Sequence, residues 1–150
     1  MAFIALDLET ILSKLDKLES DRKPDWGSMS AQRMVEHLSE MMLMAIGIGD
    51  FKIALTEEKA TSMQRFLDTD KPMAKGIEVP LAPKETPLKH DELATAIDDF
   101  VDKWLAFEEY YEENPTVTNI HPYYGNLDVS QWKKLHAKHL THHFEQFGLI

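Results

Sequence analysis

The sequence predicts an all-α protein, a four-helix bundle with a long crossover between its second and third helices. Apolar residues recur at helical spacing in four long segments, and two of these segments begin with clear start signals. No alternating run of Val, Ile and Thr with the length of a strand stands out. At 150 residues and 43% hydrophobic content, the chain has the size and core of one domain, which we expect over residues 1–150.

Each of the first two expected helices carries one apolar stripe. The first helix ends before the polar turn at 20–24, and its stripe consists of Leu8, Ile11, Leu12, Leu15 and Leu18. The second begins after Trp26-Gly27, where Ser30 can cap the first turn, and runs to about Gly47. At about 100° per residue, His37 lies in the middle of the second stripe, which comprises Ser30, Met34, His37, Met41, Met44 and Ile48.

The expected crossover occupies residues 50–89. It begins with an amphipathic stretch near 56–67 and continues into a loop with four prolines, Pro72, Pro80, Pro83 and Pro87. A loop this long in a compact domain is often a lid or a dimer contact. A passive connection between helices explains the segment at least as well.

The third expected helix spans about 91–113, and the last runs from Asp128 nearly to Ile150. On the third helix Glu108 falls on the same face as the apolar residues, which are Leu93, Ile97, Phe100, Val101, Trp104 and Tyr111. The connection over 114–127 contains His121 in a His-Pro-Tyr-Tyr-Gly turn. Asp128 and Gln131 form a capping box that starts the last helix.

Charge and composition exclude several kinds of partner. A formal net charge of -10 repels a phosphate backbone, so we expect no nucleic-acid partner. Without cysteine the chain has no disulfide and no thiolate ligand, so a metal site must use nitrogen and oxygen, and a cytoplasmic location fits. We see no export signal, and the longest apolar stretch, at 41–48, is far shorter than the roughly 20 residues that span a bilayer. We therefore expect no membrane partner.

Helical phase selects three of the seven histidines. On the last helix His139 and His143 lie centrally on the inner face, with the i, i+4 spacing of helical metal sites. His142 lies at the edge of that face. His136 also faces inward, but it is about 10.5 Å along the axis from His143 at 1.5 Å per residue, too far to share an ion easily. A third ligand must come from across the bundle, and His37 is the only histidine on the second helix.

Three neutral imidazoles and a water make an open site suited to Zn²⁺, Ni²⁺ or Fe²⁺. The bound water would be polarised, and a substrate could displace it. Glu108 is a candidate general base or further ligand, and His121 a candidate residue of the substrate pocket. The structural alternatives are a carboxylate near an exposed helix end for Glu108 and a turn residue for His121. For each inward histidine the alternative is a hydrogen-bonded core residue.

Two stretches carry a family resemblance: WGSMSAQRMVEHL, over 26–38, and HLTHHFEQF, over 139–147. They resemble the DinB/YfiT-like metalloenzymes, and the likeness extends over nearly the whole chain. More narrowly, the 121–125 turn, Trp132 and the closing Gln-Phe-Gly at 146–148 are similar to a subfamily that has no assigned function.

The resemblance implies a four-helix bundle, commonly dimeric, whose metal ion, often zinc or nickel, is held by histidines at the positions of His37, His139 and His143. Characterised members include S-transferases and isomerases that use bacillithiol, mycothiol or glutathione. A low-molecular-weight thiol is therefore an implied second cofactor.

We expect a cytoplasmic, homodimeric metalloenzyme that acts on a small-molecule substrate, either as a hydrolase or as a thiol S-transferase. Two other classes stay open: a noncatalytic metal- or ligand-binding bundle, and a metal-free dimerisation protein. The extra histidines His136 and His142 also leave open which pair on the last helix binds the ion.

Overall fold

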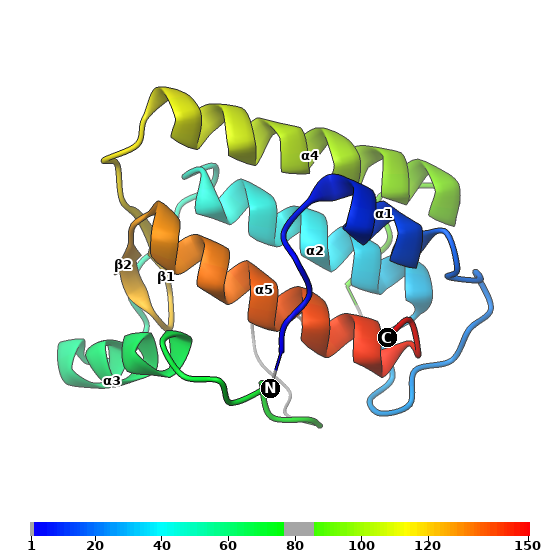
Figure 1. The fold of residues 1–150 in the computed structure, drawn as a ribbon, viewed down its shortest axis with the longest axis horizontal. Helices are drawn as coiled ribbons and strands as arrows, with labels where there is room; N and C mark the ends of the chain where they lie inside the picture. Colours follow the sequence, from blue (N-terminus) through cyan, green and yellow to red (C-terminus); the bar gives the residue numbers. More distant parts are fainter. Residues whose placement is uncertain (1, 77–85) are drawn as a thin grey trace.

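The computed structural model describes residues 2–76 and 86–150, and these are mostly helical (Figure 1). They form five helices, α1 (Leu8–Leu15), α2 (Ala31–Ala45), α3 (Glu57–Leu67), α4 (Leu93–Glu113) and α5 (Val129–Gln146). Two short strands, β1 (Asn119–His121) and β2 (Gly125–Leu127), precede α5. The expected helical class is confirmed, whereas the strands were not predicted.

Side-chain caps fix where α2 and α5 begin. The Ser30 side chain accepts a hydrogen bond from the backbone N–H of Arg33, and Asp128 and Gln131 form the complete capping box at the start of α5. Both start signals read from the sequence are thereby confirmed. Each cap satisfies backbone donors that the first turn of a helix leaves without a partner.

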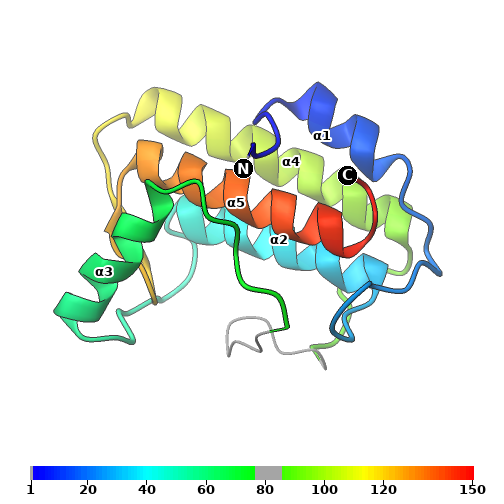
Figure 2. The ribbon, with the colours of Figure 1, turned by 60° about the horizontal axis from the view of Figure 1, so that its bottom comes forward.

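The long helices pack around a common apolar core. α2 contacts both α4 and α5, and α1 packs on α4. Figures 1 and 2 show α2, α4 and α5 running beside one another, with α1 near the start of α4 and α3 at the opposite end beside the hairpin. The largest fully buried side chains of the core include Trp104, Trp132, Phe100, Phe144 and Phe147.

The expected crossover contains a helix of its own. The amphipathic stretch near 56–67 forms α3, which packs against α5 and β2. The loop carrying Pro72 follows it, and Pro80 and Pro83 lie outside the described residues.

The inner face of α4 differs from the expected one. Its buried residues are Leu93, Ala96, Phe100, Trp104, Phe107 and Tyr111. The prediction that Glu108 faces inward is wrong, because the adjacent Phe107 takes the buried position and Glu108 is exposed. The ring of Phe107 packs against those of Tyr111 and His136, with ring-centroid distances of 5.3 and 4.9 Å. Burial of this aromatic ring sets the rotation of the helix.

The β1–β2 hairpin connects α4 to α5 in antiparallel register, with Asn119 opposite Leu127 and His121 opposite Gly125. It also completes the end of α2. The Tyr111 hydroxyl and the Asn119 amide both donate to the carbonyl of Ala45, at 2.5 and 3.1 Å. This carbonyl belongs to the last turn of α2, where no partner within the helix is available.

None of the helices within residues 2–76 and 86–150 is both long enough and apolar enough to cross a membrane.

Candidate metal centre

Three histidines from two helices converge at one point of the core. The Nε2 atom of His139 lies 2.9 Å from Nε2 of His37 and 3.0 Å from Nε2 of His143. One ligand atom from each of the three histidines lies within 4.8 Å of the others, close enough to bind a metal ion. The trio selected from helical phase is therefore brought together by the fold.

The positions of the three residues explain the convergence. His139 and His143 project from successive turns of α5 toward the same point, as i, i+4 residues do. His37 reaches them from α2, which packs on α5. All three side chains are buried, with exposed fractions of 4% for His37, 9% for His139 and 6% for His143.

Burial keeps the three imidazoles neutral. It lowers the pKa of His37 to about 3 and that of His143 to about 4, and it holds the pKa of His139 well below 6.5. The neighbouring histidines lower the pKa values of His37 and His139 further, because a proton on one ring disfavours a proton on the next. A neutral imidazole has a free lone pair on one ring nitrogen, and this is the form that binds a metal ion.

Gln146 fixes the tautomer of His143. The side-chain amide nitrogen of Gln146 donates to the carbonyl of Trp26 at 2.9 Å, so its Oε1 is the atom that faces His143. His143 Nδ1 donates to this oxygen at 2.7 Å. The proton of His143 is thus on Nδ1, and the lone pair is on Nε2, the atom that points into the trio.

Hydrogen bonds alone do not satisfy the trio. Nε2 of a neutral imidazole carries either one hydrogen or one lone pair, yet Nε2 of His139 lies within hydrogen-bond distance of two other ring nitrogens. If it carries a hydrogen, it can donate to only one of them. If it carries a lone pair, it faces the lone pair of His143. A cation that accepts all three lone pairs removes this conflict, so the residues fit a divalent metal ion.

Replacing Gln146 with leucine is expected to weaken zinc or nickel binding by about 10- to 100-fold, the usual effect of losing the partner of a ligating histidine. Leucine has a similar size but cannot accept the hydrogen bond from His143 Nδ1. Competition with a chromophoric chelator measures the dissociation constant. A Gln146→Leu protein that binds within about twofold of the wild type would show that Gln146 does not prepare His143 for the ion.

The other two histidines of α5 take separate places. His136 is fully buried, with its ring between those of Phe107 and Trp132 at centroid distances of 4.9 and 5.7 Å, and it is not part of the cluster. Among the described residues, the group placed to bind an ion therefore does not include His136. His142 is half-buried at the edge of the face, as expected, and its ring packs against that of Trp26.

His136 is expected to make folding sensitive to acid. Burial lowers its pKa to about 3 in the folded chain, from 6.5. Between these values the unfolded chain binds a proton that the folded chain does not, so the free energy of unfolding falls as pH drops through this range. The slope from one such group approaches about 1.4 kcal/mol per pH unit.

In the His136→Phe variant, unfolding between pH 6 and 4 should take up about one proton fewer than in the wild type. Urea denaturation at several pH values gives this slope. An unchanged slope would mean that His136 is not buried in its neutral form.

The two candidate catalytic residues lie away from the trio. Glu108 is exposed on the outer side of α4. His121 is buried in the hairpin, where its Nδ1 accepts a hydrogen bond from the backbone N–H of Tyr123 at 3.0 Å and its ring packs on Tyr124 and Trp132. Within the described part of the chain neither residue forms a hydrogen bond, ion pair or ring contact with the trio.

Three residues near the cluster do not stand out from the sequence as functional: Gln146 beside His143, and Arg33 and Glu40 near His37. Gln146 follows His143 by three residues and Glu40 follows His37 by three, so each lies on the same side of its helix as the ligand. This spacing is the sequence signal that marks Gln146 and Glu40 as neighbours of the ligands.

A family model described as a protein of unknown function, DUF1569, matches residues 3–148. Comparisons with curated proteins and with solved structures found no match. Since the family model covers nearly the whole sequence, the chain belongs to the DUF1569 family.

Proposed function

We propose that this protein is a metal-dependent enzyme whose divalent ion, zinc or nickel, is held by His37, His139 and His143. The observation that carries the proposal is the convergence of three neutral imidazoles, with Nε2 separations of 2.9 and 3.0 Å across two helices. Three protein ligands are the number found in catalytic zinc sites, whereas structural zinc sites have four.

The chain supplies the ligands, their orientation and a largely dry environment. Gln146 holds His143 with its lone pair inward. Met34 and Met41, about one turn before and after His37 on α2, are buried and help to keep bulk water from the trio. A divalent ion bound there would polarise a water molecule or a small-molecule thiol at its open position. The reaction types that follow are hydrolysis and thiol S-transfer.

The proposal includes a fold and a family likeness. We infer that α1, α2, α4 and α5 form a four-helix bundle, which the packing of α2 on α4 and α5 and of α1 on α4 supports. We further propose a likeness to the DinB/YfiT-like metalloenzymes and, with it, a low-molecular-weight thiol as second cofactor. A cytoplasmic homodimer that acts on a small-molecule substrate completes the proposal.

An activity screen of the zinc- and nickel-loaded protein tests the function. Glutathione, bacillithiol and mycothiol are each combined with electrophiles, and esters and amides serve as hydrolysis substrates. We expect turnover that requires the metal and disappears in the His37→Ala variant. A thiol affinity that survives the loss of His37 would contradict a metal-bound thiolate.

The screen, together with the metal loading that precedes it, separates the noncatalytic binding protein from the metal-free dimerisation protein. A well-metallated protein that is inert with every substrate would favour a noncatalytic binding role. A protein that takes up neither zinc nor nickel would instead favour a metal-free dimerisation protein.

A further inference from the structure

The second ring nitrogen of His37 lacks the support that Gln146 gives to His143. His37 Nδ1 is buried and has no hydrogen-bond partner among the described residues. The nearby polar group is a carboxylate oxygen of Glu40, one turn further along α2, at 3.9 Å. This distance is about 1 Å longer than a charge-assisted hydrogen bond.

The carboxylate of Glu40 is held close to His37 by Arg33. Arg33 is buried, and its Nη2 forms an ion pair with Oε1 of Glu40, the same oxygen that faces His37. Glu40 itself is less constrained, with 28% of its side chain exposed. To form a hydrogen bond with His37 Nδ1, this oxygen must come about 1 Å closer.

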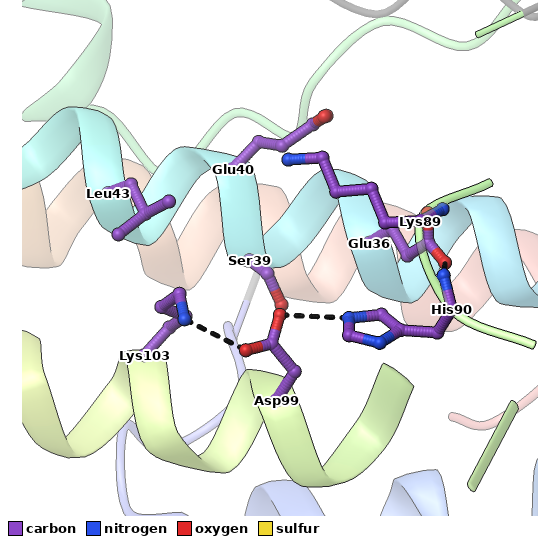
Figure 3. Close-up of a pocket in the computed structure, with 8 residues that line it drawn as sticks. All are labelled: Glu36, Ser39, Glu40, Leu43, Lys89, His90, Asp99 and Lys103. Carbon is purple, nitrogen blue, oxygen red and sulfur yellow. Dashed lines mark hydrogen bonds and ion pairs between the residues drawn. The ribbon is translucent and has the colours of Figure 1, made fainter. Parts of the chain in front are cut away.

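Glu40 also lies at the edge of a pocket of about 260 Å³ between α2 and α4. In Figure 3 its carboxylate points away from Asp99, which is instead bound by His90 and Lys103 at 3.2 and 2.8 Å. His90 and Lys103 are therefore engaged by Asp99, whereas Lys89 is a further basic residue that lines this pocket.

We propose that Glu40 is a positioning residue of the metal centre, which accepts a hydrogen bond from His37 Nδ1–H when Nε2 of His37 binds the ion. The inference rests on the proposed metal site. A histidine that binds through Nε2 carries its proton on Nδ1, and a buried N–H without an acceptor weakens the folded, metal-bound state. A carboxylate in this position orients the ring and strengthens the ligand.

Metal affinity of the full chain tests the inference. We expect Glu40→Ala to weaken zinc and nickel binding by about 10- to 100-fold and Glu40→Gln by less, since the amide oxygen can still accept the hydrogen bond. The matched control is Glu36→Gln. Glu36 approaches Arg33 at 3.8 Å, and within the described residues it forms no ion pair with His37. Since Glu36 is not the partner of a ligating histidine, this control should change the affinity by less than about threefold.

Nitrogen-15 NMR of the zinc-loaded protein provides a second readout. The Nδ1–H resonance of His37 should move in Glu40→Gln and stay in place in Glu36→Gln. Wild-type affinity in Glu40→Ala, or an unmoved resonance in Glu40→Gln, would overturn the inference and leave the metal site intact. A wild-type chain that binds neither metal would overturn both proposals. Because Glu40→Gln preserves shape, its spectrum decides the question even if Glu40→Ala does not fold.

Discussion

Replacing His143 with alanine is expected to reduce metal binding by far more than the about 10- to 100-fold that follows from losing a supporting residue. The substitution removes one of three converging ligand atoms, whose Nε2 lies 3.0 Å from that of His139. Two imidazoles do not complete the three-ligand set of a catalytic zinc site. Isothermal titration with zinc and with nickel, combined with metal analysis of the purified variant, measures the loss.

The matched control is His136→Phe. His136 is also a buried histidine of α5, but its ring packs between Phe107 and Trp132 and is not part of the cluster. Phenylalanine keeps a ring of similar shape, so metal binding should be unchanged. Equal losses in the two variants, or full binding by His143→Ala, would show that the trio is not the site.

Replacing Trp132 with alanine is expected to lower the free energy of unfolding by about 3–5 kcal/mol, the range for truncating a buried aromatic side chain. Trp132 is fully buried in the first turn of α5, and its ring lies 5.8 Å from that of His121 and 5.7 Å from that of His136. The cavity would separate the hairpin from α5. Since domains are typically stable by only about 5–15 kcal/mol, much of the margin would be lost.

Urea denaturation of the Trp132→Ala protein at neutral pH measures this effect. Leu105→Ala serves as the control because Leu105 is an exposed apolar residue of α4, and its loss should change stability by no more than about 0.5 kcal/mol. A loss below about 1 kcal/mol for Trp132→Ala would contradict the packing described for the hairpin.

The helices were predictable because their signals are local. Ser30 and Asp128 cap the helices that they were expected to start, and the apolar stripes identify the segments that became α1, α2, α4 and α5. The hairpin was missed because its two strands have three residues each, and their pairing depends on the helices around them. The face of α4 was misjudged because periodicity alone does not show that Phe107 is buried in place of Glu108.

The candidate site was predictable only in its ligands. Helical spacing is enough to predict that His139 and His143 share one face of their helix and that His37 lies on the inner face of its own. The supporting roles of Gln146 and Glu40 depend on which nitrogen of each histidine ring carries the proton and on where that nitrogen points. The sequence shows neither. That His136 lies outside the cluster, with its ring packed against those of Phe107 and Trp132, is likewise visible only in the structure.

Metal analysis of the untagged protein, followed by titration with zinc and nickel, tests the central claim most directly. The convergence of His37, His139 and His143 leads us to expect about one equivalent of a divalent transition metal per chain, present after purification or taken up on titration. Less than about 0.2 equivalents of any such metal, with no uptake of added zinc or nickel, would contradict the claim that these histidines form a metal centre.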